Sequence, residues 1–322
     1  MDRPLISVVI PVYRGAAFLE ELHRRLATTL EAITPAYELV FVDDCSVDDS
    51  WAVLTKLAEG NAHTRLVRLM KNHGQQRAVL CGLEHAQGEF VVTIDEDLQH
   101  RPEEIALLYN EIRSSDADVV VGRFENKKHG FVRGIGTRVV KWVASVTIGV
   151  PRDLDLTSFR IIRRKTVDEV LRLRNTNPVV GFLLYHVTHR FKNVVVNHDP
   201  RRSGKSGYTF KALVDYFLCM IIDYSDLPLR AVGYFGFGSA VMSVVLGVYY
   251  LQLYVRHRIG VAGFPTIVLL IILFSGLILM SLGIIGSYLL RILQSANVTR
   301  MYAVRDRVGF TEAESSRFSM QP

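Results

Sequence analysis

The chain has 322 residues, of which 49% are hydrophobic, and its formal net charge is +6 at pH 7. A mean hydropathy of +0.20 is high for a soluble protein, and three cysteines in so long a chain exclude a disulfide framework and favour a reducing compartment. The basic balance, with a sequence pI near 9.2, suits an anionic membrane or a phosphate as partner, and no nucleic-acid partner is expected.

Residues up to about 210 alternate between strand-like and helix-like segments. Leucines recur at helical spacing over residues 19–30, Ser46 is expected to cap the next helix, and Pro102 to begin a later one. Gly82 is expected to let its helix pack closely. Strands rich in β-branched residues are predicted at 5–12, 37–44, 64–70, 90–95 and 117–121. Strands that alternate with helices predict an α/β domain with a parallel, doubly wound sheet.

Carboxylates follow two of these strands. They are Asp43 and Asp44 after the second strand, and Asp95, Glu96 and Asp97, with the amide Gln99, after the fourth. Alternate side chains of an extended chain share a face, so Asp95, Asp97 and Gln99 are expected to converge. Such hard oxygen donors suit Mg²⁺ or Mn²⁺ bound to phosphate oxygens, at the sheet edge where open α/β sheets bind ligands. The alternative is a solvated acidic turn. Together the two strand ends predict a pocket for a nucleoside diphosphate.

Two long blocks without charged residues follow the first domain, at 231–254 and 265–290. Each exceeds the roughly 20 apolar residues that a helix needs to cross a bilayer, and neither resembles a secretory leader. The predicted organisation is a cytoplasmic domain at 1–210, an interfacial amphipathic helix at 211–230, transmembrane helices at 231–254 and 265–290 joined by a loop at 255–264, and a cytoplasmic tail at 291–322.

Short motifs recur in order along the chain. They are Val9-Ile-Pro-Val-Tyr13, Val42-Asp-Asp-Cys-Ser46, Asn72-His-Gly-Gln-Gln-Arg-Ala78, Asp95-Glu-Asp-Leu-Gln99, Gly122-Arg123, Asp155-Leu-Thr-Ser-Phe-Arg160 and Arg201-Arg-Ser-Gly-Lys-Ser-Gly-Tyr208. With the two apolar blocks, they resemble family-2, GT-A-fold polyisoprenyl-phosphate glycosyltransferases. That group includes undecaprenyl-phosphate aminoarabinose transferases, bactoprenol glucosyltransferases and dolichyl-phosphate mannose synthases. The chain departs from the pattern at Gly15 and Ala16, where relatives often have acidic residues, and at Gly207, where a Lys is usual.

The resemblance implies a GT-A domain followed by two transmembrane helices, and an inverting glycosyltransferase. The expected reaction transfers a sugar from a nucleotide-diphosphate sugar, UDP- rather than GDP-linked, to a polyisoprenyl phosphate such as undecaprenyl phosphate. It would require Mg²⁺ or Mn²⁺ and serve cell-envelope glycan synthesis or lipid A modification. The enzyme would be a multi-pass protein of the bacterial inner membrane, in contact with membrane lipid, with its catalytic domain in the cytoplasm. It would form a homo-oligomer, by resemblance a tetramer.

The resemblance also assigns roles to single residues. Asp97 and Asp155 are the expected catalytic residues. The expected nucleotide-sugar contacts are Pro11, Tyr13, Asp43, Asp44, Asn72, Asp95 and Glu96. The expected acceptor-phosphate contacts are Arg123, Arg133, Arg160, Arg201 and Ser206. The expected metal ligands are Asp95, Asp97 and Gln99. For Asp155 the alternative is an ion pair with Arg152 or Arg160.

Two other classes stay open. A processive polysaccharide synthase also uses a GT-A domain, but it usually has a Gln-x-x-Arg-Trp motif and more spans, which this sequence lacks. A non-catalytic, membrane-anchored scaffold would keep the fold without activity, and the departures at Gly15 and Gly207 leave room for it. Product length separates the first class from a lipid-phosphate glycosyltransferase, and a turnover assay separates the second.

Overall fold

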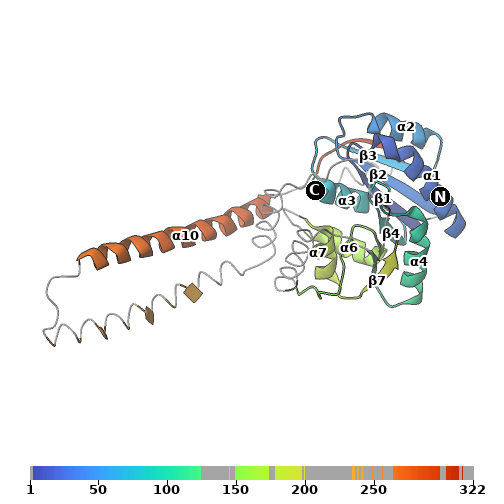
Figure 1. Cartoon of the computed structure of the whole chain (residues 1–322). Helices are drawn as coiled ribbons and strands as arrows, with labels where there is room; N and C mark the ends of the chain where they lie inside the picture. The colour runs from blue at the N-terminus through green and yellow to red at the C-terminus, as the bar shows by residue number, and fades with distance from the viewer. Residues whose placement is uncertain are drawn as a thin grey trace. The chain divides into compact units, whose positions relative to one another are not determined.

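The computed structural model describes residues 3–124, 145, 149–173, 178–197, 199, 264–297, 302–311 and 314, with isolated positions between 234 and 256. The chain divides into two units: one comprises Met1–Ser145, Val150–Gly207 and Val298–Pro322, and the other comprises Val146–Gly149 and Tyr208–Asn297. Within the described residues, the first unit contains an eight-stranded sheet and the second contains the long helix α10, Phe264–Asn297 (Figure 1).

The sheet of the first unit has the strand order β7-β5-β6-β4-β1-β2-β3-β8. Its strands are β1 (Ile6–Val12), β2 (Tyr37–Asp43), β3 (Thr64–Leu69), β4 (Phe90–Thr93), β5 (Val119–Phe124), β6 (Arg160–Arg163), β7 (Phe191–Val196) and β8 (Val304–Val308). The central strands β1, β2 and β4 are buried along their whole length. Burial on both faces explains why their sequences are continuous apolar runs rather than alternating ones.

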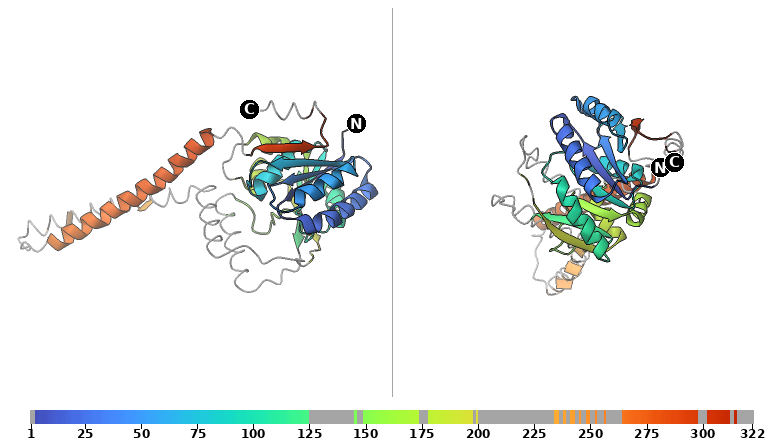
Figure 2. Two further views of the ribbon diagram at one scale, coloured as in Figure 1. Left: turned by 90° about the horizontal axis from the view of Figure 1, so that it is seen from above. Right: turned by 90° about the vertical axis from the view of Figure 1, so that its right-hand side faces the viewer.

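Helices cover both faces of the sheet (Figure 2). Leucines and isoleucines of α1 (Ala16–Ile33), α2 (Ser50–Glu59) and α4 (Ile105–Ser114) pack on one face. Apolar residues of α3 (Gln75–His85), α6 (Arg164–Arg172) and α7 (Val180–Val187) pack on the other. A Cβ at Gly82 of α3 would lie 2.2 Å from Val9 Cγ1, which confirms that this glycine permits close packing.

The five strands predicted from the sequence run parallel to one another, but two further strands of the sheet are antiparallel. The strands β1 to β4 are mutually parallel where they pair, and β5 is parallel to β7. However, β6 runs antiparallel between β4 and β5, and β8 runs antiparallel to β3. Strand β6 is antiparallel to β5 because it begins at the end of the sheet at which β5 finishes. Strand β8 covers what would otherwise be an exposed strand edge.

Within the range predicted as a cytoplasmic tail, 291–322, one segment adds a strand to the sheet. Ala303 O accepts a hydrogen bond from Met70 N at 2.8 Å, and β8 then pairs with β3. Beyond the strand, Glu314 contacts Arg65, with an N···O distance of 3.2 Å. The chain therefore leaves the first unit after Gly207 and rejoins it after Asn297.

The membrane segments predicted from sequence fall partly outside the described residues. Residues 211–230 lie outside them, as do most of 231–254. Across the part of the chain that is described, no helix has both the length and the apolarity needed to cross a bilayer.

One buried histidine joins the returning segment to the sheet domain. His85 is 1% exposed; its Nδ1 bonds the carbonyl of Cys81 at 2.8 Å, and its Nε2 accepts a hydrogen bond from Arg307 Nε at 3.1 Å. A carbonyl can only accept and a guanidinium can only donate, so the imidazole is neutral with its proton on Nδ1. Burial lowers the pKa of His85 from 6.5 to about 4.

This histidine predicts a loss of stability in acid. The folded-state pKa is below the unfolded value, so the stabilisation is complete above pH 6.5 and is lost as the pH falls toward 4. Between pH 8 and pH 5 the free energy of unfolding should fall by about 2 kcal/mol from this group. Chemical unfolding of the chain at both pH values measures it. His85→Gln should make the change in the free energy of unfolding between pH 8 and pH 5 smaller by that amount. The same substitution at the exposed His186 should leave this change as it is in the wild type. An equal change in the two variants would contradict the assignment.

Candidate active site

The candidate site lies at one edge of the sheet, where the carboxyl ends of the parallel strands meet. In register, Val12 of β1 pairs with Asp43 of β2, and Asp43 with Arg68 of β3. The loop after β4 begins beside them, because β4 pairs with β1 on its other side. The segment before β6 reaches the same edge, since β6 is antiparallel to β4. The strand order thus brings distant acidic motifs together.

The two carboxylates after β2 are buried and bound to the protein. Asp43 is 0% exposed and lies 3.3 Å from Arg68 Nε, and its Oδ1 accepts the Ser46 N–H at 3.1 Å. Asp44 is 2% exposed and accepts the backbone N–H groups of His73 at 2.7 Å and Gly74 at 2.8 Å. Asp44 therefore holds the loop that carries the exposed Asn72. Its own N–H donates to Val12 O at 2.9 Å, between Pro11 and Tyr13 at the end of β1.

Ser46 does not cap the helix that follows it. Helix α2 begins at Ser50, and the residue before it, Asp49, makes no capping hydrogen bond with its side chain. The Ser46 hydroxyl instead accepts the Arg14 N–H at 3.2 Å. It ties the loop after β1 to the loop after β2, a tertiary role that local helix signals cannot reveal.

The loop after β4, residues 94–99, which we call the metal loop, is not extended as predicted. Strand β4 ends at Thr93, a turn follows at residues 96–97, and Leu98 has φ of 59°. Consequently Asp95 and Asp97 do not share a strand face. The Gln99 side-chain amide donates to Asp97, so Asp97 and Gln99 are adjacent while Asp95 has different neighbours. Within the described residues, no group of three or more acidic, His or Cys side chains is arranged to hold a metal.

Asp95 is surrounded by polar groups that the sequence did not single out for it. Its carboxylate accepts hydrogen bonds from Gln75 Nε2 and Ser158 Oγ, both at 2.6 Å, and lies 3.8 Å from His100 Nδ1. The His100 ring is stacked between Phe124 and Phe159. Gln75 and Ser158 both lie within motifs quoted for the resemblance, which is the one signal that could have found them.

Arg160 lies behind Asp95 and inside the protein. It is 4% exposed, and its Nε donates to Thr93 Oγ1 at 3.2 Å. Burial lowers the pKa of Arg160 to about 10, while the nearby Asp95 raises it. The guanidinium therefore stays charged at neutral pH and balances Asp95 from within. Such burial does not support the acceptor-phosphate role expected for Arg160.

Arg123 is more accessible. Its side chain is 52% exposed and its Nε lies 3.5 Å from Asp155 Oδ2. Asp155 thus forms an ion pair with Arg123, a partner that the sequence analysis did not name for it. The Asp155 N–H donates to Asn193 Oδ1 at 2.9 Å, which fixes the segment before β6 against β7. The other expected acceptor contacts, Arg133, Arg201 and Ser206, lie outside the described residues.

Glu96 links the metal loop to the loop after β1. A Cβ at Gly15 would lie 3.0 Å from Glu96 Cγ, and Glu96 Oε1 lies 3.4 Å from the Tyr13 N that donates to it. Burial, and secondarily the neighbouring carboxylates Asp95 and Asp97, raise the pKa of Glu96 to about 7. A side chain at position 15, where relatives often have an acidic residue, would therefore enter space that Glu96 of the metal loop already fills in this protein.

This contact predicts a compensating pair of substitutions. Gly15→Glu should lower sugar transfer roughly tenfold or more, because overpacking a filled site costs about 1–3 kcal/mol and here also brings two carboxylates together. The double variant Gly15→Glu/Glu96→Ala should recover most of the activity, since the second change vacates the space. Steady-state rates of the two variants and of Glu96→Ala measure the coupling. Additive losses in the double variant would contradict it.

Over the residues that the structure describes, the doubly wound sheet carries acidic loops at its carboxyl edge and no glycine-rich phosphate loop, an arrangement of the GT-A type. The profile of glycosyl transferase family 2 matches residues 7–170. The chain belongs to this family and is a glycosyltransferase. Among solved structures, a glucosyl-3-phosphoglycerate synthase from Mycobacterium tuberculosis, in complex with Mn²⁺, UDP-glucose and phosphoglyceric acid, has a TM-score of 0.52 at 16% identity. The match covers 69% of this chain and 79% of the synthase.

Named relatives match this chain along almost its whole length. The undecaprenyl-phosphate 4-deoxy-4-formamido-L-arabinose transferase of Sodalis glossinidius is 30% identical, over 93% of both chains. The uncharacterized glycosyltransferase YkcC of Bacillus subtilis is also 30% identical, over 94% of both chains. These matches continue beyond residue 170, so the likeness extends past the sheet domain to the C-terminal part.

Proposed function

We propose that the protein transfers a sugar, with inversion, from a nucleoside-diphosphate sugar to a polyisoprenyl phosphate, with undecaprenyl phosphate the preferred acceptor. One observation carries the donor half: the Asp44-bound loop and the metal loop lie together at the carboxyl edge of a GT-A sheet. The acceptor half is supported by relatives that are named as undecaprenyl-phosphate sugar transferases over nearly their full length.

The donor site we propose uses Mg²⁺ or Mn²⁺. The residues fit such an ion: Asp97 and Asp95 are hard oxygen donors, and the Gln99 side-chain nitrogen is engaged with Asp97, so its carbonyl oxygen can still serve as a ligand. Mg²⁺ usually takes one or two carboxylates together with substrate phosphates and waters. A solved structure of like fold was determined with Mn²⁺ and UDP-glucose. When bound, the ion would neutralise charge on the departing diphosphate.

The protein's own groups orient the substrates. Asp44 fixes the 72–74 loop for the nucleoside, and Gln75 and Ser158 hold the Asp95 carboxylate in one orientation. An oxygen of the acceptor phosphate attacks the anomeric carbon as the bond to the leaving diphosphate breaks. That oxygen is already anionic at neutral pH, so the step does not require a strong base. Arg123 is half exposed and pairs with Asp155 through Nε, so it would add only its remaining donors to the binding of the acceptor phosphate.

The membrane is the proposed place of reaction. The uncharged blocks at 231–254 and 265–290 would span the bacterial inner membrane, with the sheet domain in the cytoplasm, where sugar nucleotides occur. Helix α10 exposes many large apolar side chains, among them Ile271, Ile278 and Ile292, each at least 60% exposed. Lipid, or another copy of the chain in a homo-oligomer, would cover them.

A direct assay tests the function. Purified protein is incubated with undecaprenyl phosphate and a panel of labelled UDP- and GDP-sugars, with Mg²⁺ or Mn²⁺. The expected result is a single lipid-phosphate sugar formed from one UDP-sugar. Products that grow with time would indicate a processive synthase instead. No transfer from any donor, by a protein that still binds nucleotide, would favour a scaffold.

A further inference from the structure

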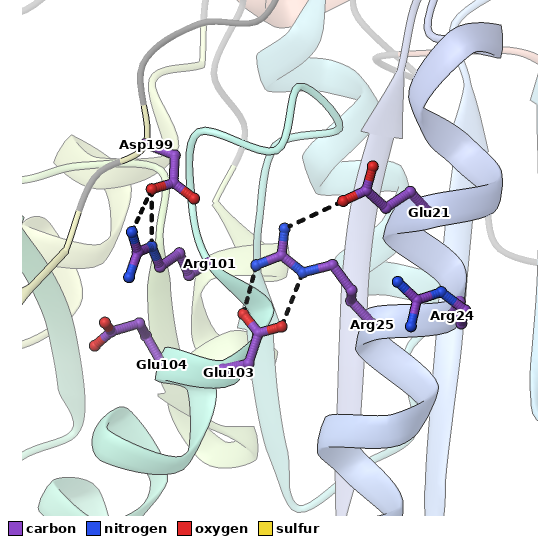
Figure 3. Close-up of a pocket in the computed structure, with 7 residues that line it drawn as sticks. All are labelled: Glu21, Arg24, Arg25, Arg101, Glu103, Glu104 and Asp199. Atoms are coloured by element: carbon purple, nitrogen blue, oxygen red, sulfur yellow. Dashed lines mark hydrogen bonds and ion pairs between the residues drawn. The ribbon is translucent and has the colours of Figure 1, made fainter.

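A group of ion pairs surrounds a pocket between α1, the end of β7 and the short 3-10 helix η1, Pro102–Glu104 (Figure 3). In this pocket, two nitrogens of Arg101 donate to one oxygen of Asp199, Nε at 2.9 Å and Nη2 at 2.5 Å. The two residues are 98 positions apart in sequence. Because Arg101 comes two residues after the metal loop and Asp199 comes three residues after β7, this pair joins two parts of the active-site edge.

Backbone contacts reinforce the junction. Asp199 N donates to the carbonyl of Gln99 at 3.0 Å, so the segment after β7 lies directly against the metal loop. Asn197 Nδ2 donates to Glu104 Oε1 at 2.6 Å, and Glu104 is 7% exposed. The segment that follows β7 is thus held at Asn197 and again at Asp199, both times by residues on or just beyond the metal loop.

The position of this junction in the chain suggests its use. Gln99 also donates to Asp97, the central residue of the donor site proposed above. Asp199 comes two residues before Arg201, which the sequence assigns to the acceptor phosphate. Gln99 of the metal loop therefore contacts the donor carboxylate Asp97 through its side chain and, through its carbonyl, the segment that continues to the acceptor motif.

We propose that Arg101 and Asp199 are positioning residues that couple the metal loop to acceptor binding. By joining the end of β7 to the metal loop, they fix where the chain enters the acceptor motif relative to the donor diphosphate. The inference rests on the proposed function, because it concerns the lipid phosphate as acceptor. Neither residue needs to touch a substrate.

The same pocket supplies a matched control. Arg25 of α1 donates through the same two nitrogens, Nε and Nη2, to the two oxygens of Glu103 at 2.8 and 2.6 Å. This ion pair joins α1 to η1. The Arg25 charge also acts on Asp199, but no hydrogen bond or ion pair is seen between Arg25 and either Asp199 or the metal loop among the described residues. An effect of charge or stability alone would appear in both pairs, whereas positioning of the acceptor segment should depend on Arg101 and Asp199 only.

The experiment compares Arg101→Ala and Asp199→Ala with Arg25→Ala. For the first two variants the KM for undecaprenyl phosphate should rise on the order of 2- to 30-fold, the range of coupling through such networks. Affinity for the nucleotide, measured by calorimetry, should be unchanged, and Arg25→Ala should leave the lipid KM as it is. In the double variant Arg101→Glu/Asp199→Arg, which exchanges the two charges, the lipid KM should fall part of the way back to the wild-type value.

Three outcomes overturn the inference: an unchanged lipid KM in an active enzyme, an equal rise in Arg25→Ala, or a loss confined to nucleotide affinity. If Arg101→Ala does not fold, Arg101→Lys, which keeps the charge and loses the fork, replaces it with the same expected direction. Absence of lipid transfer by the wild-type protein would instead refute the proposed function, so the two failures are distinguishable.

Discussion

Replacing Asp97 by Asn is expected to lower sugar transfer on the order of 10²-fold or more. The change removes the negative charge from the carboxylate to which Gln99 donates and which would hold the divalent ion. It leaves the size of the side chain unchanged, so the turn at 96–97 should persist. Initial rates at saturating donor and lipid, with a titration of Mg²⁺ or Mn²⁺, measure the effect. The variant should also need more metal ion to reach its own maximal rate.

A control separates this effect from a general loss of charge. Asp116 is 93% exposed and pairs with Arg190 at the surface, away from the sheet edge that carries the site. Asp116→Asn should keep full activity. Full activity of Asp97→Asn, or of the wild-type enzyme in excess EDTA, would rule out the metal site.

The central strands were predictable because their cause is local. Apolar runs that are buried on both faces occupy β1, β2 and β4, and the structure has these strands and β3 within a few residues of the predicted ranges. Acidic motifs at the ends of β2 and β4 followed from the same pattern. Once strands are parallel and adjacent, residues at their carboxyl ends share one edge of the sheet, whatever their separation in sequence.

Strand β8 shows what sequence patterns could not predict. Its residues, Val304–Val308, include two arginines and an aspartate, and its partners in β3 are more than 200 residues away. Only the pairing with an otherwise exposed strand edge makes it a strand. No strand was predicted within residues 291–322, because so short and charged a segment forms one only with its tertiary partner.

The metal loop shows a different limit. Convergence of Asp95, Asp97 and Gln99 was derived from an extended chain, but the turn at 96–97 and the left-handed Leu98 change the direction of each side chain. The polar groups around Asp95 come from α3 and from the segment before β6. Single polar residues in distant motifs have no periodicity, so only the assembled sheet reveals that they meet.

Arg201→Ala is expected to raise the KM for the lipid acceptor roughly 10- to 100-fold, while nucleotide-sugar affinity changes little. Two phosphate-bearing substrates must approach each other, so the site needs two centres of positive charge. A divalent ion on Asp97 can serve the donor, and the remaining acidic residues cannot serve the acceptor. Arg160 is buried behind Asp95, and Arg123 is already paired with Asp155 at 3.5 Å. These contacts leave Arg201 as the stronger candidate.

The magnitude follows from one charge-assisted hydrogen bond, worth about 1.5–3 kcal/mol, which corresponds to roughly 10- to 100-fold in affinity. Arg202→Ala, next in the sequence, is the matched control and should have a much smaller effect. Arg123→Ala should raise the lipid KM less than Arg201→Ala, because Asp155 already offsets part of the Arg123 charge. Lipid kinetics and donor calorimetry on the three variants decide the assignment. If Arg201→Ala loses affinity for the nucleotide sugar while its lipid KM is unchanged, Arg201 belongs to the donor site. The acceptor phosphate must then be bound elsewhere along the basic 201–208 motif or by Arg123.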